Sequence, residues 1–289
     1  MKKYISLGDL LLDYRKVKGI SQIDFADNLN VDRRTILRWE KNSTLLNHEK
    51  ENDLIQETLL PYQLIRNLNS LNPIPTYYDF EIRKYSLNEI SNPLPDASWF
   101  KQQMHIKTDR IHKIDFNKDV DYLLKVLQSQ KVSLGYGKRE LINEAIKLLP
   151  ELNIIITDES GYYSGHSIFL PLKGEVYTKL KAKEITEDQS KPNDLTNYKT
   201  QTTPFFYLYD ITVDCNDNAY YLLNSIFRFF SKLEDHHYIV GSITKRHDTF
   251  ELVKQFGMNI IWQDEKSQEL SGQKYASRFN EGNFKKFLS

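Results

Sequence analysis

The sequence has little cysteine, no long apolar run and no excess of either charge. Cys215 is the single cysteine among 289 residues, which excludes an internal disulfide and a multi-cysteine zinc site. No apolar run approaches the roughly 18 residues of a membrane helix. Asp9 and Asp13 interrupt the apolar stretch behind the basic start, which argues against a signal peptide. The 39 basic residues balance the 39 acidic ones, which excludes a uniformly basic coat.

These absences predict a cytoplasmic chain without membrane contact. The histidines offer no His-x-x-x-His pair at helical spacing, so no metal site is expected. The chain still holds 18 Tyr and 15 Phe, which is enough bulky apolar material for a sizeable core. At roughly 100–200 residues per domain, the length suggests two domains.

The spacing of apolar residues changes once along the chain. Residues 1–68 carry apolar side chains at helical spacing. Residues 69–76 contain Pro73 and Pro75 among small polar residues, which is typical of a linker. From 77 to 289, strand-like runs alternate with amphipathic helices. The predicted fold class is α + α/β: an N-terminal all-α domain (1–68), a linker (69–76) and a mixed α/β domain (77–289).

Residues 19–32 predict two short helices joined by a tight turn. Gly19 is placed to end a helix in the left-handed conformation. Ser21 and Asp32 are placed to cap the next two helices. Asn30 tolerates the left-handed backbone that the turn between those helices needs. Together these residues predict a helix-turn-helix.

The third helix of this module has an apolar and a basic face. Ile36 and Trp39 lie one turn apart and are predicted to face the core. The remaining side chains form an exposed face: Arg33, Arg34, Thr35 and Arg38. The segment resembles the XRE (Cro/repressor-like) family over residues 6–66. The matching residues are Arg15, Gly19-Ile20-Ser21-Gln22, Ala26, Val31, Thr35 and Trp39-Glu40.

The resemblance implies double-stranded DNA as a partner. It implies that Gln22 contacts a phosphate and that the exposed residues of the third helix reach bases and backbone in the major groove. It also implies a structural ion pair between Arg15 and Glu40. The alternative is a helical module whose arginine face contacts another protein.

The second domain resembles the GNAT superfamily of acyl-CoA transferases. The resemblance lies in the order of elements over residues 77–289 and in three segments. Residues 161–172 are similar to the hairpin that enters the sheet, residues 206–213 to the central strand that splays around the pantetheine arm, and residues 250–258 to the last helix and its glycine exit. The resemblance implies acetyl-CoA or CoA as ligand.

Two departures argue against transferase activity. The segment Asp214–Tyr220 stands where the family places a glycine-rich pyrophosphate loop. It contains no Gly, no Arg and two Asp, so side chains would crowd and repel the phosphates. Leu252 or Val253 occupies the place of the family's general-acid tyrosine, and neither can donate a proton. We therefore expect no cofactor and no enzyme, with acetyl-CoA or CoA as the alternative.

Four residues of this domain are candidates for a cleft or ligand site. Tyr207 and Tyr209 lie on the central strand, Cys215 follows it, and Tyr275 lies near the C-terminus. Packing is the competing explanation for each of them. No catalytic residue is assigned.

The function expected from these patterns is a sequence-specific DNA-binding transcriptional regulator with a GNAT-like sensor or dimerisation domain. Double-stranded DNA, a second copy of the chain and a small-molecule effector are the expected partners. Two alternatives stay open. One is an N-acyltransferase that uses acetyl-CoA and is targeted by its helix-turn-helix. The other is a protein-interaction module without DNA binding.

Overall fold

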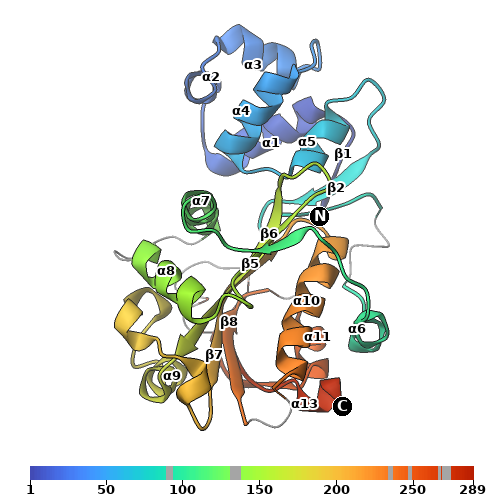
Figure 1. Ribbon diagram of the computed structural model, residues 1–289. Helices are drawn as coiled ribbons and strands as arrows, with labels where there is room; N and C mark the ends of the chain where they lie inside the picture. Colours follow the sequence, from blue (N-terminus) through green and yellow to red (C-terminus); the bar gives the residue numbers. More distant parts are fainter. Residues whose placement is uncertain (89–93, 131–137, 234–236, 247–248, 266–267, 269–274) are drawn as a thin grey trace. The chain divides into compact units, whose positions relative to one another are not determined.

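A computed structural model describes residues 1–88, 94–130, 138–233, 237–246, 249–265, 268 and 275–289 (Figure 1). The chain forms two compact units that are not contiguous in sequence. The first unit is Met1–Asn92 with Ser160–Ser164 and Val213–Asn216, and the second is Pro93–Glu159, Gly165–Thr212 and Asp217–Ser289. The first unit therefore extends past the expected boundary at residue 68.

Helices make up most of the first unit. They are α1 (Leu7–Lys18), α2 (Gln22–Asn28), α3 (Arg33–Glu40), α4 (His48–Thr58) and α5 (Tyr62–Leu68). Gly19 ends α1 at a φ of 67°, Ser21 begins α2 with a capping box, and the Asp32 side chain accepts from the Thr35 N–H. These predicted ends are confirmed, because short polar side chains satisfy the first N–H groups of each helix.

A small sheet completes the first unit and corrects the prediction of an all-α domain. Strands β1 (Lys2–Tyr4), β2 (Thr76–Asp79) and β3 (Lys84–Ser86) form an antiparallel sheet in the order β1-β2-β3. Tyr4 and Tyr78 are each 2% exposed and lie in the helical core. The strand-like residues after the expected linker thus pair with the N-terminus, because their tyrosines are buried there.

Two distant segments also belong to the first unit. The Tyr162 ring stacks on Tyr62 at 3.8 Å between centroids, and its hydroxyl donates to Asn52 Oδ1 at 2.7 Å. The Tyr85 N–H donates to the Asp214 carbonyl at 2.7 Å. The unit is therefore built from three stretches of chain.

The second unit is organised around a mixed sheet (Figure 1). Its described strands lie in the order β4-β5-β6-β7-β8-β10-β9. They are β4 (Ile111–Lys113), β5 (Ile154–Thr157), β6 (Tyr163–Leu172), β7 (Phe205–Val213), β8 (Ile239–Thr244), β9 (Met258–Asp264) and β10 (Ser277–Gly282). Strand β7 runs parallel to β8, and β10 runs antiparallel to both β8 and β9.

Helices cover both faces of this sheet. In Figure 1, α7, α8 and α9 lie on one side, and α10 and α11 on the other. The described helices are α6 (Ala97–Gln103), α7 (Val120–Gln130), α8 (Lys138–Leu148), α9 (Gly174–Lys181), α10 (Asn216–Ser231), α11 (Phe250–Gln255) and α13 (Lys285–Leu288). The core is largely aromatic, and Phe206 of β7 packs on Phe230 of α10 at 5.2 Å between centroids.

The mixed α/β class and the predicted order of elements are confirmed: two helices, a strand pair, the central strand, and then alternating helices and strands. The opening strand of the large sheet is β4, and the strand-like residues that follow position 76 belong to the small sheet of the first unit instead. Between β6 and β7 the chain forms α9 and three short 3-10 helices, η1 (Glu187–Gln189), η2 (Pro192–Asp194) and η3 (Tyr198–Thr200).

Candidate functional site

The central strands of the second unit are paired over only part of their length. The parallel register joins Phe205–Leu208 of β7 to Ile239–Ser242 of β8. Strand β7 then continues to Val213 and β8 to Thr244, and β8 stays paired to β10 up to Thr244. The pairing therefore ends before either strand does, which leaves the carboxyl-terminal part of β7 outside the β8 ladder.

A buried polar cluster begins two residues beyond the last paired residue of β7. Asp210 Oδ2 lies 2.9 Å from His166 Nε2 of β6, and the His166 side chain is 0% exposed. The Thr212 hydroxyl donates to Asp210 Oδ2 at 3.1 Å. Gln130, the last residue of α7, donates its amide to the Thr212 hydroxyl at 3.1 Å. A carboxylate is thus held between an imidazole and a hydroxyl at the point where the two strands cease to pair.

Within this cluster, whose outer residue Gln130 is exposed, solvent also reaches part of the Asp210 side chain. It is 12% exposed, whereas His166 is fully enclosed. Buried carboxylates need partners, because removal of charge from water is costly. The cluster supplies those partners and still leaves part of the carboxylate accessible, which is the arrangement that a general base requires.

The sequence analysis missed this cluster, although a signal was present. Asp210 is the only charged residue in the aromatic and aliphatic run Phe205–Val213, and His166 precedes the apolar run 167–172. A lone ionisable residue inside a buried strand is uncommon unless it has a partner. Neither residue can be assigned to the other from sequence, because the pairing of β6 with β7 depends on the fold.

Tyr207 and Tyr209 are buried rather than open to a cleft. The Tyr207 hydroxyl donates to Glu187 Oε1 of η1 at 2.8 Å. Burial and then the nearby Glu187 carboxylate raise the pKa of Tyr207 well above its usual value. Lys138 Nζ lies 5.6 Å from the centroid of the Tyr209 ring, and burial raises the pKa of Tyr209 as well. Both tyrosines hold neighbouring segments in place and are poor acids near neutral pH.

Cys215 and Tyr275 are half-buried and belong to different units. Cys215 forms no disulfide. It lies in the stretch Val213–Asn216 of the first unit, while Tyr275 precedes β10 in the second. Neither is part of the cluster around Asp210.

The segment after β7 does not fit a pyrophosphate. Asp214 is 7% exposed, and its backbone N–H donates to the Ser164 carbonyl at 3.0 Å. The Asp214 N–H is therefore already hydrogen-bonded and is not available to an anion. Asp217 adds a carboxylate in the first turn of α10, and it would repel phosphate at a helix start that otherwise favours anions.

The predicted DNA-contacting residues of the first unit fall into two groups. The Gln22 side chain is already hydrogen-bonded within the first unit. Its amide donates to Glu40 Oε2 at 2.7 Å, and its Oε1 accepts from Arg33 Nε at 3.2 Å. Arg15 Nε donates to Glu40 Oε1 at 2.5 Å, with both side chains largely buried. Arg34 and Arg38 are exposed on α3, and Thr35 is half-buried.

No family model matches the chain, and no curated protein matches it in sequence. Solved structures do match part of it. GphF, a GNAT-like decarboxylase solved with isobutyryl-CoA, is 11% identical with a TM-score of 0.40, covering 61% of this chain and 99% of that one. Ard1 from Thermoplasma volcanium is 13% identical with a TM-score of 0.36, covering 59% and 94%. The ribosomal-protein-alanine N-acetyltransferase from Brucella melitensis is 11% identical with a TM-score of 0.35, covering 60% and 98%.

The expectation of a DNA-binding transcriptional regulator is contradicted by these comparisons. The activities named among the matches are acetyl transfer and a GNAT-like decarboxylation, and the alternative expectation of an N-acyltransferase fits them better. Membership of the first unit in the XRE-like family stays a prediction. At identities below 25% and TM-scores below 0.5, the likeness carries no activity over to this chain, so the chemistry has to come from its own residues.

The described residues contain neither a metal-binding cluster nor a membrane-spanning helix. No group of three or more His, Cys, Asp or Glu within that part of the chain is arranged to hold a metal ion. None of the described helices is long and apolar enough to cross a bilayer.

Proposed function

We propose that the second unit is an N-acyltransferase that moves an acyl group from a thioester donor to an amine. The observation that carries the proposal is the position of Asp210, directly beyond the end of the β7–β8 pairing and beside His166. An extended thioester arm can hydrogen-bond to strand backbone that has no partner strand. Asp210 lies where the thioester carbonyl of such an arm would meet an incoming amine.

The reaction follows from ordinary acyl-transfer chemistry. The nitrogen of a neutral amine attacks the thioester carbonyl carbon, so that a C–N bond forms and the C–S bond breaks. The Asp210 carboxylate accepts the proton that the nitrogen loses, and the departing thiolate takes up a proton to leave as a thiol. His166 and Thr212 act on Asp210 rather than on the substrate, because they hold its carboxylate in one orientation.

The donor is recognised by its thioester arm more than by a nucleotide. In the segment after β7, the Asp214 N–H is already hydrogen-bonded to the Ser164 carbonyl, and Asp214 and Asp217 carry carboxylates. Both features disfavour the pyrophosphate of CoA. We therefore propose that an acyl group on a shorter pantetheine carrier is used at least as well as acetyl-CoA. The acceptor class is left to the assay, which offers polyamines, peptide N-termini and lysine side chains.

The test is acyl transfer by the full chain with acetyl-CoA or S-acetyl-phosphopantetheine, read by thiol release and by mass spectrometry of the amine. Asp210→Asn should lower kcat by about 10²–10⁴-fold, since general bases contribute that much. Glu175→Gln, an exposed carboxylate on α9, is the matched control and should retain full activity. A pH–rate profile should lose its acidic limb in Asp210→Asn.

Two results would overturn the proposal. One is the absence of acylated amine with every donor and acceptor offered. The other is an Asp210→Asn variant that turns over like the parent chain, in which case the cluster is structural. Thermal unfolding of each variant shows whether lost activity reflects lost fold.

A further inference from the structure

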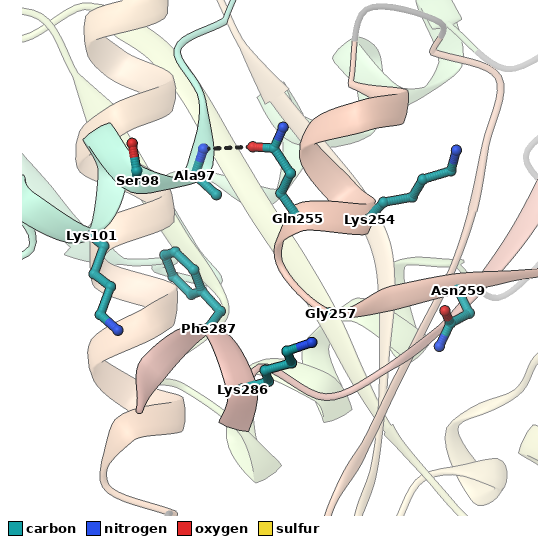
Figure 2. Close-up of a pocket in the computed structure, with 9 residues that line it drawn as sticks. All are labelled: Ala97, Ser98, Lys101, Lys254, Gln255, Gly257, Asn259, Lys286 and Phe287. Atoms are coloured by element: carbon teal, nitrogen blue, oxygen red, sulfur yellow. Dashed lines mark hydrogen bonds between the residues drawn. The ribbon is translucent and has the colours of Figure 1, made fainter.

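A second site lies in the same unit, away from the Asp210 cluster. It is an open pocket of about 550 Å³ lined by residues of α6, α11, β9 and α13 (Figure 2). Met258 and Val240 both pair with Gly282, which places this end of β9 level with the beginning of β8. The β7–β8 pairing ends toward the other, carboxyl end of β8. The pocket therefore belongs to a different part of the sheet from the proposed active site.

The walls of the pocket are fixed by contacts between its segments. The Ala97 N–H of α6 donates to Gln255 Oε1 of α11 at 2.9 Å, as drawn in Figure 2. Phe287 of α13 is 7% exposed and packs on Phe256 at 4.9 Å between centroids. Gly257 has a φ of 94°, and a Cβ there would lie 2.7 Å from the Asn283 carbonyl oxygen. The turn into β9 therefore depends on glycine and has little freedom to move.

Charge is the outstanding property of this pocket. Lys101, Lys254 and Lys286 come from three separate helices and all line it, and none of the described lining residues is acidic. Lys254 has a partner in Glu251, 3.2 Å away on its own helix. Lys101 and Lys286 have no acidic partner within 4.0 Å in the described ranges. Three positive charges around a pocket without an acidic lining residue give it a positive potential, so the pocket favours an anion.

We propose that this pocket binds a small phosphate-bearing polyanion with at least two phosphate groups. Its volume lies within the roughly 300–1,000 Å³ of small-molecule sites. Ammonium groups act as point charges toward phosphate oxygens and do not impose the bidentate geometry of arginine. The three lysine side chains lie on different sides of the pocket and point in different directions (Figure 2), so an extended phosphate chain reaches more of them than a single phosphate does. The site holds whether or not the unit transfers acyl groups.

Occupancy would tie the C-terminal helix to α6 and α11. A polyanion that contacts Lys101, Lys254 and Lys286 joins three segments that are far apart in sequence. Because a ligand that binds only the folded state stabilises it, the second unit should unfold at a higher temperature when the anion is bound.

The experiment is calorimetric titration of the full chain with tripolyphosphate, ATP, AMP and sulfate, in 50 and 200 mM salt and without acyl donor. We expect tripolyphosphate and ATP to bind at least tenfold more tightly than AMP or sulfate. The variant Lys101→Gln/Lys254→Gln/Lys286→Gln should lose at least tenfold in affinity. The control Lys118→Gln/Lys173→Gln/Lys179→Gln removes the same charge from exposed positions of the same unit and should stay within twofold of the parent.

The arms of the titration separate the outcomes. Equal losses in both triple variants would mean that the anion responds to overall charge, and an unchanged affinity in the pocket variant would mean an adventitious ion only. Either result overturns the proposal. Binding of ATP without tripolyphosphate would also overturn it, because recognition would then depend on the nucleoside. Acyl transfer plays no part in the readout, so failure here leaves the proposed function untouched.

Discussion

At the scale of single residues, neighbouring polar groups of β7 have different tasks. Tyr207 uses its hydroxyl to hold η1 through Glu187. Asp210 keeps part of its carboxylate exposed while His166 and Thr212 fix its position. A group that is fully engaged stabilises the fold, and a group that is partly engaged remains able to react. The pair illustrates why burial alone does not identify a reactive residue.

Tyr207→Phe should make stability depend less on alkaline pH. The pKa of Tyr207 is raised in the folded chain, so the unfolded chain releases this proton first as pH rises. The stabilisation is therefore complete below the ordinary tyrosine pKa of about 10 and declines above it. Below pH 9 the variant should be less stable by about 1–3 kcal/mol, because a hydrogen bond to a charged group is lost. Urea unfolding at pH 7 and pH 10.5 measures the loss of stability and its dependence on pH.

The difference between parent and variant should shrink at the higher pH. Tyr238→Phe is a useful comparison, because burial raises the pKa of Tyr238 to about 12 while its hydroxyl accepts from the Phe284 N–H. A penalty for Tyr207→Phe that is the same at both pH values would contradict the assignment of that proton.

Sequence reasoning at the residue scale succeeded where one residue determines its own surroundings. Gly19, Ser21 and Asp32 end or begin helices as predicted, because caps act on the nearest turn of backbone. It failed for Asp210 and His166, which are 44 positions apart in numbering and meet only through strand pairing. It named Tyr207 and Tyr209 as cleft candidates with packing as the competing explanation, and both are buried.

At the scale of elements, the turn between α2 and α3 is held by one residue in an uncommon conformation. Asn30 has a φ of 49°, and the Val31 N–H returns to the Ala26 carbonyl at 3.0 Å. Asparagine tolerates this region better than other residues with a Cβ, and glycine tolerates it best. The angle between the two helices therefore depends on a backbone state that few residues accept.

Asn30→Ala should lower the free energy of unfolding of the first unit by about 1 kcal/mol, and Asn30→Gly should leave it equal or higher. Denaturant unfolding followed by far-ultraviolet circular dichroism measures both. Asp27→Ala, at an exposed position inside α2, should change stability by less than about 0.5 kcal/mol. An alanine at position 30 that costs nothing would show that the turn relaxes out of the left-handed region.

Elements with strong periodicity were predictable, and elements with mixed patterns were not. The helix α10 and the strand β7 carry continuous apolar faces, and both were found. Strand β10 was missed because Ser277–Gly282 holds Phe279 as its only large apolar side chain among polar residues. Its place between β8 and β9 comes from backbone pairing on both sides, which leaves no trace in the pattern of side chains.

At the scale of the whole molecule, neither compact unit is a continuous stretch of chain. The expected division at residues 69–76 assumed that each domain is complete in sequence. The first unit instead includes Ser160–Ser164 and Val213–Asn216. Contacts such as the stacked ring of Tyr162 on Tyr62 therefore belong to the integrity of the first unit, although Tyr162 lies directly before strand β6.

Tyr162→Ala in the full chain should weaken α4 and α5. The substitution removes the stacked ring and the hydrogen bond to Asn52, which together are worth about 1–3 kcal/mol. Native-state amide exchange of α4 and α5 should become faster by about 5–100-fold. Tyr221→Ala on α10 should leave exchange in α4 and α5 unchanged. Equal protection in the Tyr162→Ala chain would mean that the first unit is complete without its two distant segments.

The discontinuity of the first unit has a consequence for biosynthesis. Its helices α1–α5 leave the ribosome long before Tyr162 and Asp214, which lie on the order of a hundred residues further along. At 5–20 residues per second, the gap lasts on the order of ten seconds. During that time the nascent helices present Tyr62 and the edge of β3 without their final partners. The unit that begins with α1 is thus completed only after much of the second unit has been made, and the nascent chain is exposed to chaperones and proteases in the interval.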